Sequence, residues 1–192
     1  MRNADLQRGD MDKIGHAFRK LSLRKGWLVD GRSGVTADEI VRSVRRRKRE
    51  NATKVVIVDY VQLVRRPSRM SPHEALSEIV TTLADAAKQD GLAYVVMSQL
   101  NRELEKREDK RPLLSDLRES GSLEERSKCV VGIYRGAVYG DPKPNVDYDP
   151  KRESKPDEDE YRKQVQLLVL KNSNGRIGKV TANWHGPTTT ME

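Results

Sequence analysis

The sequence lacks the features of a disulfide-bonded, zinc-binding or membrane-spanning protein. Its single cysteine, Cys129, excludes an intrachain disulfide, and its three histidines have no cysteine or histidine nearby at metal-ligand spacing. The longest apolar runs extend over only a few residues, whereas crossing a bilayer takes roughly 20. Residues 1–20 contain no apolar region of the kind found in secretory signals. We therefore expect a reduced, cytoplasmic protein that does not associate with membranes.

Aromatic residues are also scarce, which limits the kind of core that the chain can form. They make up 5% of the residues, so the core should be aliphatic, and Cys129 should be buried and inert beside Val130 and Val131. Charged residues make up 34%, and the net charge is +8. This charge favours a polyanionic partner, with nucleic acid ahead of an acidic membrane. A length of 192 residues suits a single domain.

Two helices are predicted from the residues at their first turns. Thr36 and Glu39 have the spacing of a capping box, in which each side chain hydrogen-bonds to the main chain of the other residue. Ser71 and Glu74 repeat the pattern, with a proline at the first helical position. Apolar residues follow both starts at helical spacing, and Gly91 is expected to end the second helix.

Strands and helices alternate along the chain, which indicates an α/β fold. Residues 55–58 are four consecutive β-branched residues, a pattern typical of a strand buried on both faces of a parallel sheet. We predict a mostly parallel sheet with flanking helices, a late antiparallel strand pair, and binding groups at the carboxyl ends of the strands. The expected strands are 27–30, 55–58, 93–97, 129–134, 164–171 and 179–184.

Two polar residues follow neighbouring strands of this predicted sheet. Asp59 comes directly after the strand at 55–58, where phosphate-handling α/β proteins place a magnesium-binding acid, although many strands end in an aspartate for capping or turn reasons. Gln99 follows the next strand, and its amide could donate to a phosphate oxygen or simply cap the strand. Because the two strand ends meet at one edge, we expect Asp59 and Gln99 to converge on one crevice.

The segment from Ser98 to Gly121, SQLNRELEKREDKRPLLSDLRESG, resembles the stretch between nucleotide sensor and DNA loop in DnaB-type replicative helicases. VDYVQL at 58–63, WLVDGRSGVTADEI at 27–40 and KNSNGRIG at 171–178 extend the resemblance. It covers most of the chain outside a segment at 141–160 that is rich in proline and charge. We expect residues 141–163 to form a flexible surface loop. A recombinase-type ATPase would share the core fold, but SDLRESG favours the helicase branch.

The resemblance implies that residues 1–192 are the C-terminal part of a RecA-like motor domain lacking the strand that carries the phosphate loop. It implies an ATP-dependent DNA helicase that translocates on single-stranded DNA and unwinds duplex during replication. Its cofactors would be ATP and Mg²⁺, and its assembly a homo-hexameric ring with ATP sites between subunits.

The resemblance also implies a role for individual residues. Asp59 would help to hold the magnesium ion of bound ATP, and Gln99 would contact the γ-phosphate and respond to its loss. Lys171 would belong to the catalytic and nucleotide-binding site. The single-stranded DNA would be bound by Arg118, Glu119 and Gly121, because an arginine and exposed main-chain amides suit phosphate oxygens without reading bases. Without the resemblance, residues 106–118 would be interpreted as a solvated charged linker.

Two parts of the family pattern are missing from the sequence. No G-x-x-x-x-G-K-[ST] motif occurs, and in the family this phosphate loop and the catalytic glutamate lie upstream of the matched region. We therefore expect residue 1 to lie inside the motor domain, and the chain to be inactive unless a partner chain supplies the loop. The family's KNR reads Lys171-Asn172-Ser173, so Ser173 stands where an arginine finger is expected. Arg176 is a hypothetical substitute.

Three interpretations of this pattern remain open: a truncated gene product, one half of a split helicase, and a degenerate relative. The last would be a non-catalytic single-stranded-DNA-binding subunit or modulator, an alternative favoured by Ser173. The stretch 123–128 also departs from the family, since it reads LEERSK in place of an acidic, amide-bearing IEQDAD. The basic run at 42–49 is either the solvated end of a helix or a second DNA contact.

Overall fold

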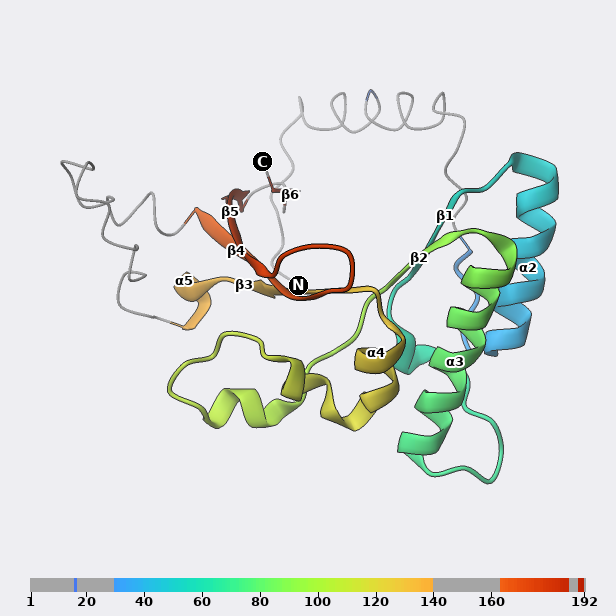
Figure 1. The fold of residues 1–192 in the computed structure, drawn as a ribbon, viewed down its shortest axis with the longest axis horizontal. Coiled ribbons are helices and arrows are strands. Elements are labelled where there is room, and N and C mark those ends of the chain that lie inside the picture. The colour runs from blue at the N-terminus through green and yellow to red at the C-terminus, as the bar shows by residue number, and fades with distance from the viewer. Residues whose placement is uncertain (1–15, 17–29, 140–162, 187–189, 192) are drawn as a thin grey trace.

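The computed structural model describes residue 16 and residues 30–139, 163–186 and 190–191. The expected strand at 27–30 and the expected loop at 141–163 fall almost wholly outside these ranges. Strands and helices alternate through the first half of the described chain, and antiparallel strands dominate the second half (Figure 1). In chain order the elements are α2 (Ala37–Asn51), β1 (Val55–Val58), η1 (Val61–Leu63), α3 (Pro72–Asp90), β2 (Ala93–Val96), η2 (Arg102–Lys106), η3 (Leu114–Ser120), α4 (Gly121–Arg126), β3 (Cys129–Tyr134), α5 (Gly136–Tyr139), β4 (Gln164–Asn172), β5 (Gly178–His185) and β6 (Thr190–Met191).

Both predicted helix starts are confirmed. The Glu39 N–H donates to Thr36 Oγ1 at 3.3 Å, and the Thr36 N–H donates to the Glu39 carboxylate at 2.8 Å. Ser71 and Glu74 make the same reciprocal pair at the start of α3, whose C-cap is Gly91 in the left-handed conformation with φ of 60°. Each box satisfies main-chain N–H groups that have no partner within the helix. Local sequence therefore fixes where these helices begin.

The strands form two separate sheets. β1 and β2 pair in parallel with Val55 opposite Ala93, whereas β3, β4, β5 and β6 form an antiparallel sheet in that order. The prediction of parallel strands followed by a late antiparallel pair is confirmed, and β3 joins the antiparallel group. Among the described strands, β2 and β3 each have a neighbour on one edge only. They are thus edge strands of two separate sheets.

The predicted burial of β1 and β2 on both faces is wrong for the described chain. Val56 and Val58 are buried, but Val55 and Ile57 are 54% and 50% exposed. The reason is that α2 and α3 lie side by side against one face of this pair, while no described element covers the other (Figure 1). The aliphatic core between these helices and strands contains Ala37, Val41, Val44, Val56, Val58, Val61, Val64, Ile79, Val80, Leu83, Ala86, Leu92 and Leu123.

Cys129 is exposed, so the prediction of a buried thiol is also wrong. It is the first residue of β3 and shares a face of that strand with Val131 and Ile133, which are exposed as well. Alternation along the strand, and not the apolar neighbours in sequence, decides the environment of the thiol.

The segment between η2 and η3 packs on the antiparallel sheet at Gly132. A Cβ atom on Gly132 would lie 2.8 Å from Pro112 Cβ, so only glycine allows this approach. Beside it, the Arg111 guanidinium lies over the Tyr134 ring at 5.0 Å from the centroid. Residues 107–116 are therefore packed against the sheet and do not form a linker surrounded by solvent.

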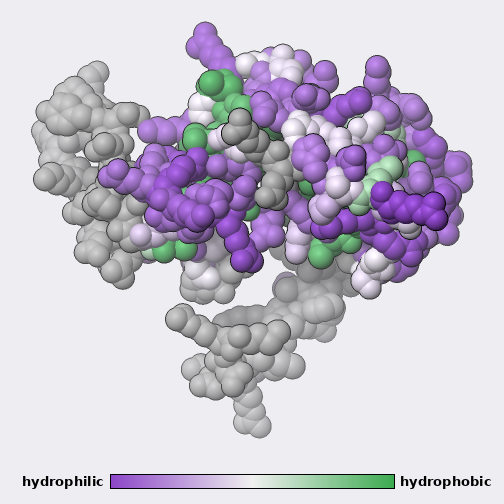
Figure 2. Space-filling view, turned by 90° about the horizontal axis from the view of Figure 1, so that it is seen from below, coloured by the Kyte–Doolittle hydropathy of each residue, from purple (hydrophilic) through white to green (hydrophobic). Residues whose placement is uncertain are grey.

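The surface is mostly polar, as the composition leads one to expect. Figure 2 shows hydrophilic residues dominating the face seen from below, with small hydrophobic areas between them. Among the described residues, no helix is both long enough and apolar enough to span a membrane.

Candidate functional site

Asp59 lies where the sequence predicted, immediately after the end of β1. The Met97 N–H donates to the Val58 carbonyl at 2.9 Å, and the Val61 N–H donates to the Met97 carbonyl at 3.0 Å. These bonds hold the ends of β1 and β2 side by side beyond the last paired residues. The Asp59 side chain is exposed, and the Asp59–Tyr60 peptide bond is cis. Asp59 is thus an accessible carboxylate at the carboxyl edge of the parallel pair.

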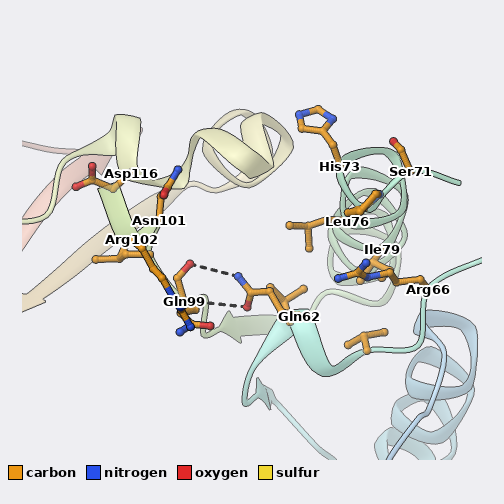
Figure 3. A pocket seen from close by; sticks show the side chains of 14 residues that line it. Gln62, Arg66, Ser71, His73, Leu76, Ile79, Gln99, Asn101, Arg102 and Asp116 are labelled. Atoms are coloured by element: carbon orange, nitrogen blue, oxygen red, sulfur yellow. Dashed lines mark hydrogen bonds between the residues drawn. The ribbon is translucent and has the colours of Figure 1, made fainter. Parts of the chain in front are cut away.

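Gln99 lies at the same edge, and its main chain is hydrogen-bonded to the side chain of Gln62 (Figure 3). Gln62 Oε1 accepts from the Gln99 N–H at 3.3 Å, while Gln62 Nε2 donates to the Gln99 carbonyl at 3.3 Å and to Ser98 Oγ at 2.9 Å. None of these bonds uses the Gln99 side chain, which is exposed. The Gln99 amide therefore remains available to a ligand.

A cavity of about 660 Å³ opens beside Gln99, between the segment after β2, the segment after β1 and the first turn of α3 (Figure 3). Its lining includes the cations Arg66 and Arg102 and the carboxylate of Asp116, and apolar residues of η1 and α3 form part of its wall. Gln99 lines this cavity and Asp59 does not. The two predicted residues share one edge of the sheet, but this cavity takes in only one of them.

Asp116, the third residue before Glu119, is the most buried charged group near the site. Its carboxylate is 8% exposed, accepts from Arg107 Nη2 at 2.8 Å and accepts from the Leu113 N–H at 2.7 Å. Its carbonyl accepts from the Asn101 N–H at 3.1 Å. Through that last bond, the start of the SDLRESG segment (residues 115–121) is joined to the residues that leave β2.

Arg118 and Glu119 lie in η3, and Gly121 is the first residue of α4. The other end of this segment is joined to the antiparallel sheet by Lys171 at the end of β4. Lys171 Nζ donates to the Glu124 carbonyl at 2.6 Å, among the last carbonyls of α4, where a positive charge is favourable. The described contacts of Lys171 are therefore with α4, whereas Asp59 and Gln99 follow β1 and β2.

Ser173 and Arg176, the residues considered for the arginine-finger position, lie in the turn between β4 and β5. Ser173 is exposed, and its N–H donates to the Lys128 carbonyl at 2.8 Å. Arg176 is exposed too, and its carbonyl accepts from Asn172 Nδ2 at 3.3 Å. The turn is thus tied at Asn172 and Ser173, and the Arg176 side chain faces solvent.

Sequence reasoning singled out neither Gln62, Asn101, Arg107 nor Asp116. Gln62 lies in the VDYVQL match, and Asp116 lies in SDLRESG. Their being polar residues inside matched motifs was the only sign in the sequence that they belong to the site. Their contacts join segments 9 to 37 residues apart, which local patterns do not predict. No group of three or more His, Cys, Asp or Glu residues that could hold a metal occurs in the described part of the chain.

The basic run on α2 is partly neutralised by α3. Arg45 Nε donates to the Asp90 carboxylate at 2.9 Å, and Lys48 Nζ donates to the Asp90 carbonyl. Arg42, Arg46 and Arg49 are exposed. The inner cations of the run thus join two helices, which agrees with the solvated-helix interpretation, and a DNA contact by the outer ones stays a prediction.

Comparison with known proteins agrees with the resemblance. A family model described as the DnaB-like helicase C terminal domain matches residues 1–192. The chain is 35% identical over 189 residues to the replicative DNA helicase DnaB of Buchnera aphidicola subsp. Acyrthosiphon pisum (strain APS), an alignment that covers 97% of this chain and 38% of the relative. It is 31% identical over 183 residues to the replicative DNA helicase DnaC of Bacillus subtilis (strain 168), covering 94% and 37%.

Solved structures give the same picture. A protein solved as an ATPase domain has a TM-score of 0.79 at 28% identity, over 97% of this chain and 61% of that one. A DnaB-like replicative helicase, solved in work on its interactions with primase, has a TM-score of 0.77 at 29% identity, over 96% of this chain and 41% of that one. The predicted α/β, RecA-like fold is confirmed. The chain spans less than two fifths of the length of the curated relatives named above, and it belongs to the family of the DnaB-like helicase C-terminal domain.

Proposed function

We propose that this chain is part of an ATP-driven motor that translocates on single-stranded DNA and unwinds duplex during replication. The observation that carries the proposal is the Asn101 N–H bond to the Asp116 carbonyl at 3.1 Å. It joins the residues after Gln99, which would detect the γ-phosphate, to the SDLRESG segment, which would bind DNA through Arg118, Glu119 and Gly121. A motor needs such a connection, because nucleotide and DNA must each change the affinity for the other.

The nucleotide would be ATP with a magnesium ion. Mg²⁺ in phosphate-binding sites commonly takes one or two carboxylates from the protein and completes its shell with phosphate oxygens and water. Asp59 is a single exposed carboxylate at the edge of the parallel pair, which fits that mode of binding. The bound metal would neutralise charge on the phosphates. Gln99 would donate an amide N–H to the γ-phosphate, and Lys171 would act at the ATP site only by leaving its contact with α4.

The phosphate loop would come from a segment outside these 192 residues, on the same or another polypeptide. No G-x-x-x-x-G-K-[ST] motif occurs in the sequence, and β2 and β3 are edge strands of two separate sheets in the described chain. Unpaired strand edges are unfavourable in an isolated soluble domain, since their main-chain groups invite another strand. A strand inserted between β2 and β3 would join the two sheets into one and complete a motor domain of which residues 1–192 form a part. The assembly would be a homo-hexameric ring.

The proposal is tested by ATPase and strand-unwinding assays on the chain with and without a segment carrying the phosphate loop. We expect activity only from the combination, and we expect Asp59→Asn and Gln99→Ala each to abolish most of the DNA-stimulated hydrolysis. Arg118→Ala should weaken binding to single-stranded DNA and flatten its salt dependence, whereas Lys88→Ala, an exposed lysine on α3, should leave both unchanged. Full activity of the chain alone would contradict this account.

A second candidate function is favoured by Ser173, which stands at the position of the arginine finger. A chain that lost this group would serve as a non-catalytic, single-stranded-DNA-binding subunit or modulator. It would bind single strands alone, with an affinity that falls as salt rises, and adding the phosphate-loop segment would give no ATP hydrolysis. The two functions are therefore separated by the same reconstitution experiment.

A further inference from the structure

The Gln62 side chain is placed as a contact between the two strand ends of the site. Its amide accepts from the Gln99 N–H at 3.3 Å and donates to the Gln99 carbonyl at 3.3 Å (Figure 3). It also donates to Ser98 Oγ at 2.9 Å. One side chain therefore satisfies both main-chain polar groups of Gln99. A shift of the Gln99 main chain relative to Gln62 would break or lengthen all these bonds together.

Gln62 is itself fixed to the end of β1. It lies in η1, three residues after Asp59, and the neighbouring Val61 side chain is 0% exposed in the core. The Val61 N–H donates to the Met97 carbonyl at 3.0 Å, which anchors η1 to the end of β2. The Gln62 side chain is thus carried by a segment whose main chain is anchored to the core and to the end of β2. A side chain that positions another group needs such an anchored support.

On its other side, Gln99 is connected to the SDLRESG segment. Two residues later, the Asn101 N–H donates to the Asp116 carbonyl at 3.1 Å, and Asp116 is held by Arg107 and by the Leu113 N–H. Two sets of hydrogen bonds, Gln62 with Gln99 and Asn101 with Asp116, together with the short main-chain stretches between them, therefore connect the end of β1 to the first turn of η3.

We propose that Gln62 is a positioning residue that couples the nucleotide state at Gln99 to the affinity of the SDLRESG segment for single-stranded DNA. The inference rests on the proposed function and deepens it. Gln62 would touch neither ATP nor DNA. It would hold the Gln99 main chain in one position while the γ-phosphate is present. When the phosphate is lost, Gln99 and Asn101 would move together, and Asp116 would move with them. The measurable quantity is the ratio of DNA affinities in two nucleotide states.

The chemistry of the amide makes the role specific. Gln62→Ala removes all three bonds. Gln62→Glu has the same shape and keeps an acceptor for the Gln99 N–H, but it replaces the two donated bonds by a carboxylate oxygen facing the Gln99 carbonyl and Ser98 Oγ. Ser98→Ala removes one of the three Gln62 bonds, together with the bond that Ser98 Oγ donates to the Gln99 carbonyl at 3.3 Å. We expect the ratio to fall furthest in the two Gln62 variants and by an intermediate amount in Ser98→Ala.

The experiment uses the full chain assembled with the segment that carries the phosphate loop. The dissociation constant of a fluorescent oligothymidylate is measured by anisotropy with a slowly hydrolysed ATP analogue and with ADP, at one salt concentration. Coupling of this kind commonly changes affinity by about 5- to 150-fold. We expect Gln62→Ala and Gln62→Glu to lower the ratio of the two dissociation constants by about 10-fold, or to bring it to 1 where the wild-type ratio is smaller than that. Gln89→Ala, a glutamine on α3 that contacts Arg45, is the matched control and should keep the wild-type ratio.

A ratio in Gln62→Ala equal to that of the wild type would overturn the inference, and so would a parallel weakening in both nucleotide states, which is the result of a merely structural role. If Gln62→Ala does not fold, Gln62→Glu and Ser98→Ala decide the question by the same ratio. If the wild-type assembly itself shows no difference between the two nucleotides, the proposed function fails and the inference fails with it.

Discussion

The Arg107–Asp116 ion pair offers the sharpest prediction about stability. Asp116 is 8% exposed and Arg107 is 29% exposed, and their closest N–O distance is 2.8 Å. The same carboxylate accepts from the Leu113 N–H at 2.7 Å, so it organises the turn that precedes η3. Asp116→Ala would leave the Leu113 N–H without its acceptor and the Arg107 guanidinium without its counter-charge, with the Arg111 carbonyl still accepting from Arg107 Nη2 at 2.9 Å.

The expected loss follows from that geometry. Removing one member of a buried ion pair costs about 3 to 5 kcal/mol, because the other charge is left uncompensated. We expect the lower end, about 3 kcal/mol, for Asp116→Ala, since Arg107 keeps some contact with water and keeps the Arg111 carbonyl as an acceptor. Asp116→Asn retains an acceptor for the Leu113 N–H and should cost about 1.5 kcal/mol, the loss expected for one charged hydrogen bond.

The assay is urea unfolding followed by circular dichroism, with Glu103→Ala as the matched control. Lys106 and Glu103 form a pair of similar length, 2.7 Å, but their side chains are 73% and 66% exposed. Breaking it should cost less than about 1 kcal/mol. The double variant Arg107→Ala, Asp116→Ala should lose less unfolding free energy than the two single variants lose in sum. If Asp116→Ala and Glu103→Ala cost the same, burial does not strengthen the Arg107–Asp116 pair and the reasoning is wrong.

Three further outcomes are expected. Gly132→Ala should cost about 1 to 3 kcal/mol in the same assay, because its Cβ would lie 2.8 Å from Pro112 Cβ. Gly178→Ala is the control and should cost much less, since Gly178 is also in a strand but has open space around it. Equal losses of unfolding free energy would refute the close approach. The pKa values of the Glu39 and Glu74 carboxyls are lowered by hydrogen bonds from Thr36 and Ser71, so their contribution to stability is present above the ordinary pKa of 4.5 and is lost as the pH falls through the lowered values. Replacing both by glutamine should flatten the decline in unfolding free energy between pH 5 and pH 3, about the range in which carboxylates titrate, and Glu78→Gln should not; an unchanged decline would contradict the role of the caps. If Arg176 replaces the finger missing at Ser173, Arg176→Ala should lower the DNA-stimulated ATPase of the assembled ring by about 10³ or more, and an unaltered rate would end that hypothesis.

Much of the fold was predictable, because its signals are local. The capping boxes at Thr36 and Ser71 involve residues three apart, and both helices begin where these boxes predict. The strand at 129–134 and the antiparallel pair that follows were placed correctly from their apolar runs and turns. The positions of Asp59 and Gln99 after adjacent parallel strands follow from the same patterns.

Burial was predicted less well. The four β-branched residues at 55–58 predict a strand, but whether both faces are covered depends on elements elsewhere in the chain, and one face of β1 is open in the described structure. Cys129 fails for the same reason, since it lies on the exposed face of β3 although its neighbours in sequence are apolar. A side chain's burial is decided by what packs on its face, and sequence shows only which face it is on.

By itself, the sequence determined the order of the main strands, the starts of α2 and α3, and the family, since these depend on short motifs and on interactions within a few residues. Only the tertiary structure decided how the motifs are connected: Gln62 with Gln99, 37 residues apart, Asn101 with Asp116, and Lys171 with α4, 47 residues away. The physical reason is that a side-chain hydrogen bond requires a distance near 3 Å and a defined direction. Segments far apart in sequence meet at that accuracy only after helices and strands have packed.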